Sequence, residues 1–316
     1  MNFITDFKSQ EKVLLRKLFD TIPLMDTWIC NIIENYIYAY VEKKDDYGNI
    51  IIRYRVKYDQ MDGEYLEWYA GGRYISIIAN YKNNLLHGKF IKFNTNGEVK
   101  IECYYIDGLL EGSYKYYIGG KLASITNYNK NIKNGEHIEF YNNSNISCKI
   151  FYINNNINGI LQKWHPNGYI EVEEIYTNSK LNGYSKKYYL NGKPKNHSFY
   201  IDNHLNYLYQ EWYSNGNQSI YCYYKDSTLD GRYKDYYING NIKTDTNYKN
   251  NKIDGCYRQF YSSGKIYLEC NYIDGVLDGN YKLWYENGIV MTTIFYKNGT
   301  PVNYKYYFPN GKTRYT

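Results

Sequence analysis

One tyrosine recurs along most of the chain at a nearly constant interval. Successive copies are 23 or 24 residues apart. They are Tyr58, Tyr81, Tyr105, Tyr128, Tyr152, Tyr176, Tyr200, Tyr224, Tyr248, Tyr272 and Tyr296. A fixed period of this length marks a repeat architecture, in which each unit buries its faces on its neighbours. The chain is therefore expected to be an array rather than a fold built around one central core.

Two glycine columns keep the same interval. The first marks a turn and comprises Gly48, Gly72, Gly97, Gly120, Gly168, Gly192, Gly216, Gly240, Gly264, Gly288 and Gly311, with Ser144 in its gap. The second opens each unit and comprises Gly63, Gly88, Gly112, Gly135, Gly159, Gly183, Gly231, Gly255 and Gly279, with Tyr207 as its exception. Three columns in phase over eleven units define the repeat. We expect bulges in the two hairpins that carry the exceptions.

Residues 231–248 show why each unit is expected to be a β-hairpin. The first segment alternates Tyr233 and Tyr237 with polar neighbours, as in a half-buried strand. After Asn239-Gly240, the return strand runs from Asn241 to Tyr248. Asn-Gly is the strongest hairpin signal for a two-residue type I′ turn, which needs positive φ at both residues. With that loop, Tyr237 pairs with Ile242, and Gly231 lies opposite Tyr248, whose ring would cover the bare backbone. Residues 249–254 then form a second turn to the next unit.

The predicted register separates two sets of aromatic residues. Tyr233, Tyr237, Ile242 and Tyr248 fall on one face, and Tyr236 falls on the other. The column of Tyr236 is aromatic in every complete unit: Trp68, Phe93, Tyr117, Phe140, Trp164, Tyr188, Trp212, Tyr236, Phe260 and Trp284. These rings are expected to pack between hairpins, with a peptide-binding or base-stacking groove as the alternative. The predicted fold is mainly β, an elongated antiparallel meander of about eleven hairpins.

Composition supports this fold class and excludes others. The chain holds 45 tyrosines and four alanines, which disfavours a mostly helical protein. No apolar run approaches the roughly 18 residues of a membrane span. The net charge is +6, with acids and bases interleaved, whereas nucleic-acid-binding proteins usually concentrate their bases on one face. We therefore expect no transmembrane segment and no nucleic-acid partner.

Residues 1–39 do not fit the repeat. Two short helices are expected there, separated by Pro23, and would form a cap over the first hairpin. An alternative arises from Ile22-Pro23 followed by Ile29, Ile32-Ile33 and Tyr36-Ile37. This run loosely resembles the F-box motif, which implies recruitment of a ubiquitin ligase. The expected division is thus a helical segment, 1–39, and a hairpin array, 40–316.

The chain offers little that resembles catalytic or metal-binding chemistry. The five histidines lie in different repeats, and neither a C-x-x-C nor an H-E-x-x-H motif occurs. Cys103, Cys222 and Cys270 share a column and are interpreted as small buried residues. Asn196-His197-Ser198 matches a short motif of SET-domain methyltransferases, but no other part of that domain is present. We expect a non-enzyme with no catalytic residue, no cofactor and no metal.

The consensus G-x-Y-x-x-[YFW]-Y-x-N-G resembles the MORN repeat, and more closely its second variant. The resemblance covers roughly residues 40–316. That variant is common in bacterial antitoxin-like repeat proteins and in proteins of large DNA viruses. The abundance of Asn, Ile, Lys and Tyr is typical of AT-rich genomes, which fits a giant DNA virus as the source, and equally an AT-rich protist or bacterium. The resemblance implies architecture more strongly than activity.

The expected function is a non-catalytic scaffold that binds a protein partner, because repeat arrays present long surfaces. One alternative is a peripheral module that binds an anionic membrane surface or phosphoinositides, to which similar repeats have been linked. The other is the F-box-like substrate adaptor. The N-terminus lacks the pattern of a secretory signal. We therefore expect an intracellular, cytoplasmic location, or a membrane-peripheral one under the first alternative.

Overall fold

The structure is a computed structural model that describes residues 38–315. Its regular elements within that range are 27 strands, with no helix. The predicted mainly β class is confirmed. The helical cap and the F-box-like run lie outside the described residues. The first strand begins at Tyr38, two residues before the expected start of the array.

The chain divides after Ser144 into two compact units, each described here by itself. Unit 1 contains β1 (Tyr38–Lys44), β2 (Ile50–Lys57), β3 (Gln60–Trp68), β4 (Ile75–Lys82), β5 (Leu85–Leu86), β6 (Gly88–Phe93), β7 (Val99–Ile106), β8 (Leu109–Ile118), β9 (Lys121–Asn129) and β10 (Ile132–Phe140). Each strand pairs antiparallel with its neighbour in the chain, except that β5 and β6 both pair with β4. The short β5 is the start of a strand interrupted before Gly88.

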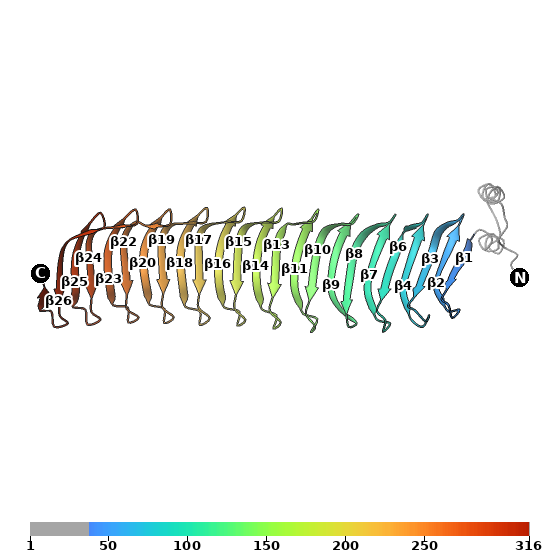
Figure 1. The fold of residues 1–316 in the computed structure, drawn as a ribbon, viewed down its shortest axis with the longest axis horizontal. Coiled ribbons are helices and arrows are strands. Elements are labelled where there is room, and N and C mark those ends of the chain that lie inside the picture. The colour runs from blue at the N-terminus through green and yellow to red at the C-terminus, as the bar shows by residue number, and fades with distance from the viewer. Residues whose placement is uncertain (1–37, 316) are drawn as a thin grey trace. The chain divides into compact units, whose positions relative to one another are not determined.

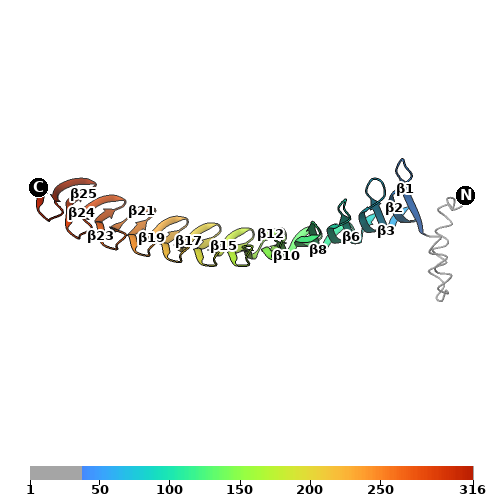
Figure 2. The ribbon, with the colours of Figure 1, turned by 90° about the horizontal axis from the view of Figure 1, so that it is seen from below.

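Unit 2 repeats the same meander. It contains β11 (Ile146–Ile153), β12 (Asn156–Ile157), β13 (Gly159–Trp164), β14 (Ile170–Thr177), β15 (Lys180–Tyr188), β16 (Pro194–Ile201), β17 (His204–Trp212), β18 (Gln218–Lys225), β19 (Thr228–Tyr236), β20 (Ile242–Lys249), β21 (Lys252–Ile253), β22 (Gly255–Phe260), β23 (Ile266–Ile273), β24 (Val276–Trp284), β25 (Val290–Lys297), β26 (Thr300–Tyr307) and β27 (Thr313–Tyr315). Figure 1 shows the strands side by side in chain order, and Figure 2 shows that unit 2 is a single layer. The predicted antiparallel meander is confirmed for each unit.

The loop at Asn239-Gly240 differs from its prediction. The amide of Gly240 donates to the carbonyl of Tyr237 at 2.8 Å, and the amide of Tyr237 donates to the carbonyl of Asn241 at 2.8 Å. The loop therefore holds three residues, and Gly240 alone has positive φ, at 91°. The predicted type I′ turn is wrong here because Asn-Gly suits a type I turn followed by a left-handed glycine equally well.

The type I′ geometry is found at the other end of the strands. Asn250 and Asn251 connect β20 to β21 and both have positive φ, at 49° and 63°. Asparagine tolerates this left-handed region better than most residues. In unit 1, Gly119-Gly120 between β8 and β9 also has positive φ at both positions. Asparagines in this sequence therefore indicate the second turn as well as the first.

A bulge beside the three-residue loop restores the predicted register. Tyr236 pairs with Ile242, and the next pair is Asp235 with Thr244, so the return strand holds one extra residue. The predicted pair of Tyr237 with Ile242 is wrong, and Ile242 lies beside Tyr236 instead. Further along, Gly231 pairs with Tyr248 as predicted.

The two exceptional repeats keep the same backbone. Ser144 has φ of 68° in the turn column, and its amide donates to the carbonyl of Tyr141 at 2.8 Å. Tyr207 has φ of 62° and pairs with Tyr224, as the glycines of its column pair with theirs. The pairing of β17 with β18 shows no further bulge at Tyr207, contrary to the expectation for that hairpin. Both substitutions place L-residues where glycine is favoured, at a cost of about 1–2 kcal/mol each.

The face that carries the repeated tyrosine, called the tyrosine face, holds what core each unit has. Tyr233 pairs with Thr246, which is buried, and its ring packs on Tyr248 at 5.5 Å. Equivalent ring pairs at 5.4–6.1 Å are Tyr65–Tyr81, Phe90–Tyr105, Tyr114–Tyr128, Tyr209–Tyr224, Tyr257–Tyr272 and Tyr281–Tyr296. The column of Thr246 also holds the buried Ala79, Cys103, Thr126, Ser198, Cys222 and Cys270. Small residues lie under large rings, and each ring pair adds about 0.5–1.5 kcal/mol beyond its buried area.

Polar side chains join each repeat to the next. The phenol of Tyr237 donates to the carbonyl of Phe260 at 2.8 Å, and the amide of Asn239 donates to the carbonyl of Ser262 at 2.8 Å. In the second turn, the side-chain oxygen of Asn251 accepts from the amide of Leu229 at 2.6 Å. These bonds satisfy backbone groups at the turns, where the ladder no longer does.

Candidate interaction surface

The predicted aromatic column lies at or near the ends of strands, on the face opposite the tyrosine face. All ten of its members are half-buried. The ten predicted turn glycines from Gly72 to Gly311 all have positive φ, between 66° and 97°. The structure spreads both sets along the units, one member to each hairpin, and gathers neither into a single site.

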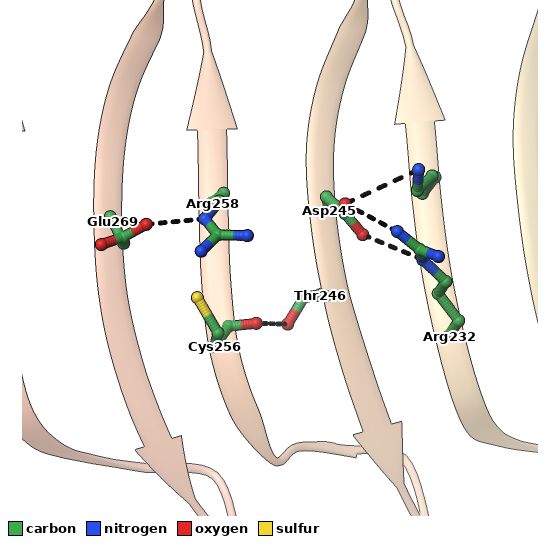
Figure 3. A network of polar contacts seen from close by, with 7 residues as sticks. Arg232, Asp245, Thr246, Cys256, Arg258 and Glu269 are labelled. Atoms are coloured by element: carbon green, nitrogen blue, oxygen red, sulfur yellow. Dashed lines mark hydrogen bonds and ion pairs between the residues drawn. The ribbon is translucent and has the colours of Figure 1, made fainter.

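A row of directly paired residues crosses this opposite face of unit 2, and we call it the central row. From β11 to β24 it comprises Lys149, Gln162, Glu173, Lys186, His197, Gln210, Tyr221, Lys234, Asp245, Arg258, Glu269 and Lys282. Asp245 contacts Lys234 at 3.6 Å and Arg232 at 3.1 Å. Arg258 donates to Glu269 at 2.6 Å (Figure 3). Opposite charges thus face one another across neighbouring strands, which favours pairing.

Beside the central row lies a group of apolar side chains that we call the aromatic patch. It spans β11 to β18 and comprises Phe151, Ile160, Ile175, Tyr184, Phe199, Tyr207, Leu208 and Tyr223. Cross-strand pairs hold Tyr184 to Phe199 and Leu208 to Tyr223. Tyr184 is 57% exposed, Tyr207 60% and Ile160 52%. Contiguous exposed apolar side chains of this kind mark interaction surfaces.

The patch contains a hollow of about 480 Å³. Its walls include Tyr184, Phe199 and Tyr207, with ring distances of 4.9 Å between the first two and 5.4 Å between the last two. Tyr207 points there because of its left-handed backbone. At the equivalent Gly231, a Cβ would lie 3.1 Å from the Cβ of Tyr223, the counterpart of Phe199.

Polar groups line the same hollow. Lys186, His197 and Gln210 are central-row neighbours on β15, β16 and β17. The Lys186 ammonium lies 5.8 Å from the centre of the Tyr184 ring. The His197 ring lies between Trp212, at 4.8 Å, and Tyr188, at 5.9 Å. Its buried Nε2 has no hydrogen-bond partner among the described residues, and burial, with the charge of Lys186, lowers the pKa of His197.

Sequence reasoning missed this patch, although its signal is present. The column of Phe151, Phe199 and Tyr223 holds asparagine in other repeats, such as Asn247 and Asn271. A run of apolar residues at that column marks the strands of the patch. Tyr207 was recognised only as an exception to glycine.

The cysteines considered for chemistry are buried thiols. Burial raises the pKa of Cys103 to about 11 and of Cys222 to about 12, so these thiols are protonated at neutral pH. The interpretation of the cysteine column as small buried residues is confirmed for Cys103, Cys222 and Cys270. Within residues 38–315, no group of three or more His, Cys, Asp or Glu side chains could hold a metal ion. That range also holds no helix long and apolar enough to span a membrane.

Five segments of the chain match the family described as MORN repeat variant: residues 86–107, 181–202, 229–250, 253–274 and 277–298. The resemblance to that variant is confirmed for these segments. No curated protein sequence matches the chain.

Solved structures give only weak similarities. The crystal structure of TcdB2-TccC3 aligns with 93% of this chain at 11% identity and a TM-score of 0.19. That of TcdB2-TccC3-Cdc42 aligns with 87% at 9% identity and a TM-score of 0.16. This chain covers 18% of the length of each matched chain. At these TM-scores the similarities carry no argument about fold or function.

Proposed function

We propose that the chain is a non-catalytic protein-binding scaffold whose binding surface is the aromatic patch of unit 2. MORN repeats commonly serve as protein-binding or membrane-associated modules. The observation that carries the proposal is the contiguity of exposed rings over neighbouring strands, with Tyr184 and Tyr207 more than half exposed. Tyrosines are enriched among the residues that dominate binding energy at protein interfaces.

The surroundings of the patch fit such an interface. The central row supplies charged and amide side chains along one side, as in the polar rim that surrounds an apolar interface core. The rings are held on paired strands, so little conformational entropy is lost when a partner covers them. We further propose an intracellular location. An origin in a giant DNA virus and an antitoxin-like relationship remain predictions from composition and resemblance.

The test compares partner recovery by the tagged full-length chain and by two variants at equivalent positions. Tyr223→Asp places a charge inside the patch. Tyr104→Asp places the same charge at an exposed tyrosine of the same column in unit 1. Affinity capture from expressing cells, quantified by mass spectrometry, is expected to lose the main partner with the first variant and to keep it with the second.

Circular dichroism of both variants controls for unfolding. Equal partner recovery by the two variants would contradict the proposal. A parallel arm measures sedimentation with vesicles that contain phosphoinositides. Loss of vesicle binding in Tyr223→Asp, with partner recovery unchanged, would assign the patch to an anionic membrane surface instead. Deletion of residues 1–37 in the same assay separates the F-box-like alternative, because ubiquitin-ligase subunits would then be lost together with that segment.

A further inference from the structure

The hollow in the aromatic patch arises from one departure from the repeat. The column of Tyr207 otherwise holds glycine with φ between 72° and 136°, and Tyr207 has a left-handed φ of 62°. An L-residue in this conformation is strained, and such strain is concentrated at functional sites. This backbone conformation places the ring of Tyr207 beside Phe199, which also contacts Tyr184.

The size and walls of the hollow suit a planar group. A volume of about 480 Å³ lies in the range of sites that take small organic molecules or large side chains. Tyr184 and Tyr207 flank Phe199 at 4.9 Å and 5.4 Å and leave more than half of their own surface in solvent. Aromatic rings pack favourably on such walls in edge-to-face or offset arrangements.

The charge of the hollow favours an anion beside the ring. Lys186 is its one charged lining residue, and no carboxylate lines it. Lys186 forms a long ion pair with Glu173, at 4.0 Å, and Glu173 also accepts a hydrogen bond from Gln162 at 3.0 Å. The ammonium of Lys186 is thus only loosely paired, and the amide of Gln210 lies in the same lining.

We infer that the hollow receives an aromatic side chain flanked by carboxylates, presented by an acidic segment of a protein partner. The ring lies between Tyr184 and Tyr207, and a neighbouring carboxylate pairs with Lys186. Leu208 of the lining pairs with the exposed Tyr223 of the patch, so an extended segment gains contacts beside the hollow that a free small molecule does not. This inference rests on the proposed function and names the chemistry of its partner.

The test measures binding of two synthetic peptides to the full-length chain by isothermal titration calorimetry. The acidic probe is Asp-Glu-Trp-Glu-Asp and the basic probe is Lys-Lys-Trp-Lys-Lys, both blocked at their termini. Tyr207→Gly restores the residue of the other repeats and therefore keeps the fold while removing one wall. Lys186→Gln removes the charge. Lys282→Gln is the matched control, because Lys282 occupies the same column outside the hollow.

The acidic peptide is expected to bind, and Tyr207→Gly and Lys186→Gln are each expected to weaken it at least tenfold. Lys282→Gln is expected to change its affinity less than twofold, and the basic peptide is expected not to bind. Equal binding of both peptides, or unchanged affinity in Tyr207→Gly, overturns the inference. Binding of N-acetyltryptophan as tightly as the acidic peptide overturns the assignment to a partner segment.

Failure of the proposed function and failure of this inference give different experimental results. If neither peptide binds but Tyr223→Asp still abolishes partner recovery, the proposed function stands and this inference fails. If the acidic peptide binds in the hollow while partner recovery survives Tyr223→Asp, the proposed function fails.

Discussion

Units 1 and 2 share one backbone repeat, but the row of directly paired residues is mostly apolar in unit 1 and mostly polar in unit 2. In unit 1 the positions equivalent to the central row are mostly apolar. From β3 to β10 they are Leu66, Ile78, Ile91, Ile125 and Ile138, with the charged Glu102 and Lys115 between Ile91 and Ile125. In unit 2 the same positions are charged or amide-bearing over most of the row.

The neighbouring positions lie two residues before the row on one strand and two residues after it on the next. From β11 to β18 they show the reverse. In unit 1 they hold pairs such as Glu64 with Asn80 and Ser113 with Asn127, whereas in unit 2 they hold much of the aromatic patch. The apolar residues of the unit 1 row are half-buried, but those of the patch include several exposed rings. Position on the sheet therefore decides whether apolar residues hold strands together or face solvent.

The largest effect is expected when a polar residue replaces an apolar one in the row of unit 1 and an apolar residue replaces a polar one in the row of unit 2. Ile78→Asp places an unpaired, half-buried carboxylate between Leu66 and Ile91, and should cost about 2 kcal/mol of unfolding free energy. Glu269→Ile at the equivalent position of unit 2 removes an exposed ion pair with Arg258 and should change stability by less than about 1 kcal/mol. Urea unfolding followed by hydrogen exchange on each unit measures both. Equal losses would show that the central row has the same role in the two units.

A smaller effect is expected where the repeats are joined. Unit 2 carries an unbroken series of side chains that bond to the next repeat: His165, Tyr189, Tyr213, Tyr237, Tyr261 and Tyr285. Unit 1 holds Asn94 and Ile118 at two of these positions. Tyr237→Phe should cost about 1 kcal/mol because a phenol–carbonyl bond of 2.8 Å is lost.

Its control is Tyr236→Phe, at a half-buried phenol that donates no hydrogen bond within residues 38–315. Thermal unfolding of the two variants measures the difference. A loss in the control as large as that in Tyr237→Phe would mean that phenol hydration, not the inter-repeat bond, sets the stability.

The smallest effect concerns acidification of unit 2. The pKa of His197 lies below its ordinary value of 6.5, chiefly because the ring is buried and then because Lys186 faces it from β15. From β17 it faces Gln210, which is uncharged. Between the lowered pKa and 6.5, the unfolded chain binds more protons than the folded chain, so stability falls as the pH falls. Between pH 7.5 and 5.5, His197→Gln should lose less thermal stability than the unchanged protein, and identical losses would contradict this account.

The sequence predicted the hairpins well because local signals and period agree. The Gly231–Tyr248 pair was predicted correctly although its derivation was wrong, since a three-residue loop and a one-residue bulge offset each other. The residues between 236 and 244 contain no sequence signal that predicts the bulge. The patch could not be predicted because its exposure depends on which strand positions are covered. The direction of Tyr207 likewise follows from a backbone conformation, not from residue type.

The loop and bulge together have a further consequence for how such a chain varies. Between the flanking paired residues, the first turn holds two residues at Gly119-Gly120, three at 238–240 and four at 70–73. In all three hairpins the strands beyond the bulge regain the same alignment, with the opening glycine opposite its tyrosine. All three hairpins carry the same one-residue bulge, so the loop alone absorbs the difference in length. A residue added or removed at this tip therefore leaves the pairing of the following strands unchanged, and the repeat tolerates tips of different length.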